Sequence, residues 1–398
     1  MKQLAINGGT PVTTKPYPTW PVWGEKEEKN LLRVLEAGEW GTIGTESKAF
    51  GRRFADYIGT TRAIPVNNGT QALELMMRGA GIGRGDEVIV PAYTFVATVS
   101  AVAYIGAVPV FADVDLDTYN ISAESVRACI TERTKAILAV HFAGRPCDMD
   151  ALRAVADEHH LLLLEDCAHA HGSSWKGVKC GALGHASAFS FQASKVLTSG
   201  EGGMILTSSD EQYVGSWRYH HSGRAPSGVN RESLGGQVLM GGNGRMAEWQ
   251  AAILDAQMDR LDEQCALRSA NQQKVTERIR QLPGIVLPPD DERITSHSGF
   301  LYAFRYVGGR DQFVEALKAE GIPCRKGYAP LHRMGMLNEP AFEKMTGRRF
   351  QNQSVLTNTE QLVQEVVWIP GEVFLADDEG IECVAAAIEK VAIALAKE

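Results

Sequence analysis

The feature that most limits the fold is an uncharged stretch from Val88 to Ala112. It is long enough to cross a bilayer, but Pro91, Gly106 and Pro109 divide it into three pieces. Strands that are apolar on both faces are typical of a parallel sheet covered by helices, so we expect no membrane span. The three pieces predict a strand, a helix and a second strand over Val88–Val90, Thr94–Tyr104 and Val108–Val114.

Apolar strand candidates alternate with helical segments along the following part of the chain. Asp148 can cap a helix that runs to about His160, because its carboxylate can accept a first-turn amide. Strands joined through helices imply right-handed crossovers. The sequence therefore predicts an α/β fold with a mostly parallel sheet covered by helices on both faces. The further strand candidates are Lys135–Phe142, Leu161–Glu165, Ala186–Phe191 and Gly203–Thr207.

The pattern changes after about Gly242, where long helical segments replace the alternation. We expect an N-terminal arm over residues 1–25, a large cofactor-binding domain over 26–245, connecting helices over 246–282 and a small α+β domain over 283–398. The elements predicted for the small domain are strands over Leu301–Val307 and Ile322–Arg325, and helices over about Asp311–Glu320 and Asp378–Lys397.

Charge, cysteine and histidine content exclude several classes of function. The 40 basic and 48 acidic residues give a net charge of −8, which argues against nucleic acid as the main partner. The cysteines include no C-x-x-C pair, so we expect reduced thiols and a cytoplasmic protein. The pairs His169 and His171, and His220 and His221, lack further ligands at familiar spacing, so we expect no metal site.

Four features supply the groups that one cofactor requires. Gly69 and Thr70 begin a predicted helix, where free amides can bind an anion. Phe95 and Asp166 each follow a strand, at the edge where ligands bind in α/β sheets. Lys195 lies among small and apolar residues, which favours a nucleophilic amine. Each feature alone also fits helix capping, an ion pair, a surface lysine or core packing. Together they match the phosphate site, carboxylate, lysine and ring wall that pyridoxal phosphate needs.

At these residues the chain resembles the DegT/DnrJ/EryC1/StrS family of pyridoxal-phosphate aminotransferases. The most specific stretches are Gly83–Asp117, Glu165–Gly172 and Phe189–Gly203. The resemblance implies a fold-type-I pyridoxal-phosphate enzyme, with a large domain and a smaller α+β domain at the carboxyl end. It also implies that Lys195 is the Schiff-base lysine and that Asp166 pairs with the nitrogen of the cofactor ring.

The resemblance implies further cofactor contacts, one of them across a subunit interface. Asn243 matches an asparagine that reaches the phosphate in the partner subunit, which implies a homodimer with shared active sites. Asn68 stands where many members carry serine, so the contribution of residue 68 itself stays open. The other implied contacts are Phe95 on the ring face, Gly69, Thr70 and Ser190 at the phosphate, and His169 near the ring oxygen.

Branches of the family differ in chemistry, and the sequence points to those that act on carbocycles. Lys195 argues against the dehydratase branch, in which histidine replaces the lysine. Ala168–Gly172, Phe189–Gln192 and His221–Arg224 are similar to 3-amino-5-hydroxybenzoate synthases, and Trp20–Trp23 is similar to inosose aminotransferases. We expect amino transfer from glutamine or glutamate to a keto-cyclitol or keto sugar. The alternatives are synthase-like aromatisation of one substrate and a cofactor-binding regulatory protein without turnover.

The sequence offers several candidate residues for each contact with a substrate. Few basic residues lie near the predicted site, which favours a free cyclitol over a nucleotide sugar whose diphosphate needs paired cations. The candidate partners of ring hydroxyls are Ser222, Tyr328 and His332. An arginine could clamp the carboxylate of the amino donor, and the candidates are Arg224, Arg245 and Arg325.

Overall fold

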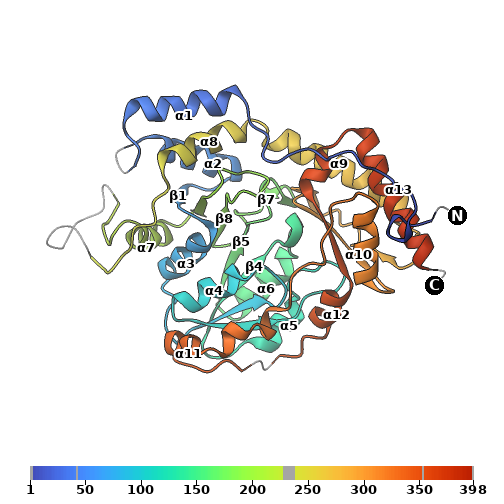
Figure 1. Cartoon of the computed structure of the whole chain (residues 1–398). Helices are drawn as coiled ribbons and strands as arrows, with labels where there is room; N and C mark the ends of the chain where they lie inside the picture. Colours follow the sequence, from blue (N-terminus) through green and yellow to red (C-terminus); the bar gives the residue numbers. More distant parts are fainter. Residues whose placement is uncertain (1–2, 42–43, 227–237, 352–353, 397–398) are drawn as a thin grey trace.

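The computed structural model describes residues 3–41, 44–226, 238–351 and 354–396. Figure 1 shows a central sheet wrapped by helices, with a smaller unit of helices and strands at one side. Both ends of the chain lie beside this smaller unit (Figure 1). The helices labelled there are α9 (Leu261–Ile279), α10 (Arg310–Ala319) and α13 (Asp378–Leu395).

The central sheet has seven strands in the order β1-β9-β8-β5-β4-β2-β3. Strands from β8 to β3 pair in parallel, whereas β9 runs antiparallel to both β8 and β1. The carboxyl ends of β4, β5 and β8 therefore lie side by side at one edge. The strands are β1 Arg62–Val66, β2 Glu87–Pro91, β3 Val108–Ala112, β4 Thr134–Val140, β5 Leu162–Asp166, β8 Ala186–Ser190 and β9 Gly203–Thr207.

Helices cover both faces of this sheet, and the strand side chains alternate between the two layers. In β2, Val88 and Val90 pack in the same core as α3 and α4, whereas Ile89 packs with α5 and α6. The predicted α/β sheet, buried on both faces, is therefore confirmed. These helices are α3 Gly69–Gly79, α4 Ala97–Tyr104, α5 Ala123–Cys129 and α6 Met149–Glu158.

Four more helices pack around the β1 edge of the sheet. Helix α2 lies between β1 and α8, α1 packs on α8, and α7 packs on α3. Phe50 and Phe54 of α2 are buried against Phe191, just beyond β8. Helix α2 therefore supports the segment just beyond β8. The helices are α1 Glu25–Ala37, α2 Glu46–Ile58, α7 Asp210–His220 and α8 Glu248–Met258.

The smaller unit is built on the antiparallel sheet β10-β12-β13. Apolar residues of α9, α10 and α13 form one core with these strands. Leu4 of the N-terminal arm joins the same core, so the predicted arm is packed against the small unit. The strands are β10 Ile285–Val286, β12 Leu301–Tyr306 and β13 Val366–Pro370.

The remaining elements are short. A third sheet, β11-β6-β7, connects the two units. Its strands are β6 Ser174–Trp175, β7 Val178–Lys179 and β11 Ile294–Ser296, and the last helices are α11 Pro340–Thr346 and α12 Thr357–Glu365. The 3-10 helices are η1 Ala5–Asn7, η2 Phe142–Gly144, η4 Leu331–Arg333, η5 Gly335–Asn338 and η6 Gly371–Leu375.

The carboxyl-terminal part differs from the prediction in two respects. The predicted strand Ile322–Arg325 is wrong, because only Arg325 pairs, in an isolated bridge with Trp368 of β13. Pro323, inside that segment, lacks the amide that a ladder requires. Leu331 packs into the core of the central sheet, so the chain leaves the small unit and returns to it. The predicted end of the last helix, Lys397, lies outside the described residues.

Two further findings concern membranes and thiols. Among the described residues, we find no helix with both the length and the apolar character needed to cross a bilayer. All seven cysteines are described, and none forms a disulfide bond. Six of them are buried, which is the usual position of a free cysteine in a protein core.

Candidate active site

The structure gathers most of the predicted cofactor residues around one cavity of about 980 Å³. It lies at the carboxyl ends of β4, β5 and β8, where Val140, Asp166 and Ser190 line it. Ligands bind at this edge of open α/β sheets. The predicted site residues that line it are Gly69, Thr70, Phe95, Asp166, His169, Ser190, Lys195 and Tyr328.

Asp166 is the last residue of β5 and is only 5% exposed. Its carboxylate accepts hydrogen bonds from the Ala168 amide at 3.1 Å and from Thr98 Oγ1 at 2.9 Å. Burial raises the pKa of Asp166, and these two hydrogen bonds oppose the rise. A buried carboxylate of this kind suits a positively charged partner in the cavity. Sequence reasoning missed Thr98, which reaches Asp166 from α4.

Lys195 follows β8 in a turn closed by its own amide, which donates to the Gln192 carbonyl at 2.8 Å. The Nζ atom lies 4.7 Å from the ring centre of Phe300, so an aromatic face adjoins the amine. Burial lowers the pKa of Lys195 to about 8, although the nearby charge of Asp166 opposes this change. The uncharged amine that a nucleophile requires is therefore far more populated near neutral pH than in an ordinary lysine.

The N-terminus of α3 presents free backbone amides to the cavity and forms a cradle that could hold an anion. The Asn68 side chain caps the helix by accepting the Gln71 amide at 2.8 Å. The amides of Gly69 and Thr70 then have no acceptor among the described residues and lie at the cavity. A Cβ on Gly69 would stand 2.5 Å from the Cβ of Ser190. Only glycine therefore allows this close approach, which leaves two amides and the Ser190 hydroxyl around one position.

Aromatic rings line the space between this cradle and Lys195. His169 stacks on Phe300 with ring centres 4.2 Å apart, and burial lowers its pKa well below the usual value. The imidazole is therefore neutral, and its buried Nδ1 atom has no hydrogen-bond partner. Phe95 lies in the loop before α4 and is 50% exposed, with its ring 5.8 Å from that of Tyr328. An exposed ring and an unpaired nitrogen are features that a bound planar ligand would complete.

These residues fit pyridoxal phosphate. The cradle at Gly69 suits its phosphate, Phe95 offers a face to its ring, and Asp166 can balance the charge of a protonated ring nitrogen. The unpaired Nδ1 of His169 can meet a polar substituent of the ring. Lys195 supplies the amine. The chain thus presents, in one cavity, each kind of group that the cofactor needs.

We expect Gly69→Ala to weaken the binding of pyridoxamine phosphate by about 10- to 100-fold, the loss associated with hydrogen bonds to a charged group. The added methyl group would push α3 away from Ser190 and open the cradle. Titration of the cofactor-free protein measures the effect without any covalent bond to Lys195. Gly83→Ala is a suitable control, because a Cβ there would meet no atom within 4 Å. Equal affinity in the two variants would contradict the phosphate role.

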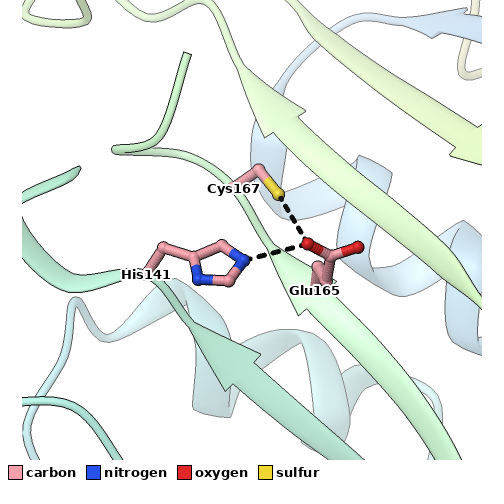
Figure 2. Close-up of side chains that lie close together, drawn as sticks. All are labelled: His141, Glu165 and Cys167. Carbon is pink, nitrogen blue, oxygen red and sulfur yellow. Dashed lines mark hydrogen bonds and ion pairs between the residues drawn. The ribbon is translucent and has the colours of Figure 1, made fainter. Parts of the chain in front are cut away.

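A buried cluster supports the strand that carries Asp166. Figure 2 shows Glu165 between His141 and Cys167, with its Oε2 atom 3.0 Å from His141 Nε2 and 3.9 Å from Cys167 Sγ. Such a trio could hold a metal ion. His141 Nδ1, however, accepts the Cys147 amide at 3.0 Å. Both ring nitrogens are thus engaged within the protein, so the network itself accounts for the trio.

Glu165 also binds the turn that follows β7. Three backbone amides donate hydrogen bonds to its carboxylate, and these bonds stabilise the carboxylate in a fully buried position. Since Glu165 precedes Asp166 on β5, these bonds fix the strand end from the opposite face of the sheet. The donors are the amides of Gly181 at 2.8 Å, Leu183 at 2.9 Å and Gly184 at 2.5 Å.

Four predicted site residues lie outside this cavity. His332 packs near Phe111, and its Nε2 atom is 2.7 Å from Glu360. Ser222 and Arg224 follow α7, on a segment that does not line the cavity. Asn243 is exposed and pairs with His221 in an isolated bridge.

The structure distinguishes the three candidate arginines for a donor carboxylate. Arg325 lines the cavity, whereas Arg224 and Arg245 do not. Its main chain is held by two hydrogen bonds of 2.9 Å with Trp368, and its guanidinium forms no ion pair within the described part of the chain. Glu201 and Glu372 also line the cavity, and sequence reasoning missed both. Only the folding of distant segments brings these side chains to the same cavity as Asp166.

Comparison with known proteins adds independent findings. A sequence model of the DegT/DnrJ/EryC1/StrS aminotransferase family matches residues 21–389. The L-glutamine:2-deoxy-scyllo-inosose aminotransferase of Streptomyces lividus is 36% identical over 418 residues, covering 98% of this chain and 97% of that protein.

Two solved structures are similar over nearly their whole length. The crystal structure of 3-amino-5-hydroxybenzoic acid synthase has a TM-score of 0.85 at 34% identity, covering 96% of this chain and 99% of that chain. The structure of DesI in the presence of its TDP-sugar product has a TM-score of 0.84 at 32% identity, covering 98% and 96%. The names of these three relatives therefore refer to different compounds, which are an inosose, 3-amino-5-hydroxybenzoic acid and a TDP-sugar.

Proposed function

Because the chain belongs to the DegT/DnrJ/EryC1/StrS aminotransferase family, a family that depends on pyridoxal phosphate, we propose that it transfers an amino group from glutamine to a ketone on a six-membered cyclitol. The observation that carries the choice of acceptor is the charge of the cavity. Its only lining cations among the described residues are Lys195 and Arg325, against the carboxylates of Glu74, Asp166, Glu201 and Glu372.

This charge distribution favours a neutral polyol over a nucleotide-linked sugar. A diphosphate needs paired cations, and one chain offers only Arg325 beyond the lysine assigned to the cofactor. Carboxylates such as Glu201 and Glu372 accept hydrogen bonds from hydroxyl groups. Tyr328, which also lines the cavity, can both donate and accept. The hydroxyl groups of a cyclitol could therefore form hydrogen bonds with several residues that line the cavity.

The proposed mechanism assigns a separate task to each residue. Bound pyridoxal phosphate supplies a carbonyl for the amino group and a ring that accepts electrons from the bond being broken. Asp166, held by Thr98, keeps a negative charge where the ring nitrogen would lie. Lys195 takes a proton from the α-carbon of the donor, returns one later, and repeats these transfers in reverse for the acceptor. Phe95 would cover one face of the ring and the neutral His169 would meet its polar substituent, so that both would help to orient the reacting groups.

We propose Arg325 as the clamp for the donor carboxylate. Arg325→Gln is expected to raise the KM for glutamine by about 10- to 100-fold, because a charged hydrogen bond to the carboxylate is lost. Steady-state kinetics with varied glutamine measure this change. Arg349→Gln is the control, since that side chain is 81% exposed and pairs with Glu343 away from the cavity. An unchanged KM in the Arg325 variant would show that another cation binds the carboxylate of the donor.

We propose that two copies of the chain share their active sites, with Asn243 acting in the partner subunit. Asn243 is exposed and does not line the cavity of its own chain, so its side chain is available to a second copy. Exposed apolar side chains on and near α1 and α8 offer a surface for a second copy. They include Leu32, Leu35, Trp40 and Trp249, which are between 43% and 59% exposed.

Subunit mixing tests the shared site. Lys195→Ala and Asn243→Ala proteins are each expected to be impaired, but a hybrid dimer contains one site free of both changes. Equal mixing should therefore restore activity at about a quarter of all sites, by random pairing of a twofold dimer. Native mass spectrometry verifies that subunits have exchanged. Exchange without recovered activity would contradict the role of Asn243 in trans.

Direct competition tests the acceptor. The enzyme loaded with pyridoxamine phosphate is mixed with an inosose and a nucleotide-linked keto sugar at equal concentration. The products are then distinguished by mass spectrometry. We expect faster amination of the inosose. Faster amination of the nucleotide sugar would overturn the choice of acceptor, but it would not affect the assignment of the chain to the family.

A further inference from the structure

The N-terminal arm reaches the turn that carries Lys195. Trp20 Nε1 donates a hydrogen bond to the Ala193 carbonyl at 3.0 Å. Ala193 lies inside the turn that the Lys195 amide closes onto Gln192. The other hydrogen bonds of that turn are local: the Ser194 amide donates to Gln192 Oε1 at 2.9 Å, and the Gln192 amide donates to Ser190 Oγ at 3.4 Å. The indole therefore ties the turn to a distant part of the chain.

Arg268 of α9 lies against the same indole. Its guanidinium carbon is 4.8 Å from the ring centre of Trp20, and the side chain is only 1% exposed. Its Nε and Nη1 atoms have no hydrogen-bond partner among the described residues. A buried cation without a carboxylate partner is costly, and the face of an indole is a favourable neighbour for it. The ring of Trp20 thus helps to stabilise the buried guanidinium of Arg268.

Arg268 in turn contacts the wall beside Lys195. A Cβ on Gly299 would stand 2.5 Å from the Cβ of Arg268, which shows how closely that backbone passes. The next residue, Phe300, has its ring centre 4.7 Å from Lys195 Nζ and stacks on His169. Trp20 is thereby linked to Lys195 along two routes. One runs through the turn, and the other runs through Arg268 and Phe300.

We propose that Trp20 is a positioning residue that aims the amine of Lys195 into the cavity. This inference rests on the proposed role of Lys195 and adds to it a function for the N-terminal arm. The arm has anchors of its own, so a change at Trp20 need not detach it. The Val22 carbonyl accepts Gln257 Nε2 at 2.8 Å, and the buried carboxylate of Glu320 accepts the Ala5 amide at 2.8 Å.

The test compares Trp20→Phe with Trp23→Phe. The first variant keeps a ring over Arg268 but loses the donor to Ala193. The second changes the same arm at a side chain that is 65% exposed and makes no hydrogen bond or ring contact in the part of the chain that the structure describes. We expect Trp20→Phe to lower kcat by about 2- to 10-fold, the effect of one neutral hydrogen bond, with little change in the KM for glutamine. Trp23→Phe should match the parent enzyme.

A second measurement uses the cofactor-free protein. The reagent 2,4,6-trinitrobenzenesulfonate modifies uncharged amines, and peptide mass mapping follows residue 195 as the pH is varied. In the parent, burial lowers the pKa of Lys195 to about 8. A loosened turn would expose the amine to water and raise the pH of half-maximal modification. Asp166 and His169 also lie at the cavity, and both stay unchanged in these variants.

The outcomes separate positioning from a structural role. A shifted midpoint with lower kcat in Trp20→Phe alone supports the proposal. A lower thermal stability with an unchanged midpoint and kcat would overturn it, as would equal effects of the two variants. The role of Lys195 itself is tested independently by borohydride reduction of the parent holoenzyme. Failure of that assignment and failure of the Trp20 proposal are therefore distinguishable.

Discussion

Lys195→Ala is expected to lower kcat by more than about 10³-fold, because the chain would lose both its covalent anchor for the cofactor and its proton carrier. The aspartate, the phosphate cradle and the ring wall would remain, so the variant should still bind pyridoxal phosphate, but without a covalent bond. No other lysine lines the cavity within the described residues. Steady-state kinetics and the absorption spectrum of the reconstituted protein measure the two effects.

Borohydride reduction followed by peptide mapping supplies the decisive control. In the parent enzyme the label should reside on residue 195 alone. Lys179→Ala is a matched variant, since this lysine lies over the ring of Tyr57, away from the cavity. It should keep both the label and the activity. A label on any lysine other than Lys195 would refute the assignment.

Asp166→Asn is expected to slow the first half-reaction by about 10²-fold, because a neutral amide cannot stabilise the protonated ring nitrogen. The substitution preserves size, and the new amide nitrogen can donate to Thr98 Oγ1 in place of accepting from it, so the fold should persist. Single-turnover measurements with glutamine, in a stopped-flow instrument, follow the loss of the starting cofactor spectrum. Rates close to those of the parent would show that Asp166 does not pair with the ring.

Thr98→Val provides a graded comparison for this prediction. It removes one donor to Asp166 while the carboxylate remains, so the expected loss is about 2- to 10-fold, as for a single hydrogen bond. An effect of Thr98→Val as large as that of Asp166→Asn would mean that the donor, and not the charge, limits the reaction. Circular dichroism of both variants verifies that the fold is kept.

The central sheet could be predicted because its signal is local. Val88, Ile89 and Val90 are apolar in succession, and the structure places them alternately in two cores. The small unit was predicted less well. Pro323 interrupts an apolar segment that resembles a strand, and β13 lies far along the chain from its neighbour β12. Pairing over such distances depends on tertiary packing, which short-range patterns do not record.

The candidate site shows the same division between local and distant information. Asp166 ends one strand and Lys195 follows another, and the ends of such strands meet at one edge, so the sequence predicted that they lie close together. Arg325 reaches the cavity from the small unit, and the sequence offered it only as one of three arginines. Thr98 carries no local signal, because a threonine inside a helix has many ordinary roles. Residues contributed by other elements therefore required the structure.

The central claim is that this chain transfers an amino group from glutamine to a keto-cyclitol. Its most direct test supplies the purified holoenzyme with an inosose and with glutamine carrying ¹⁵N at the α-amino group, and analyses the products by mass spectrometry. The account predicts an aminocyclitol that carries the isotope, together with the keto acid of the donor, and no product when glutamine is omitted. Formation of an aromatic acid from an amino- or keto-cyclohexene carboxylate without any amino donor, and no labelled aminocyclitol, would contradict it.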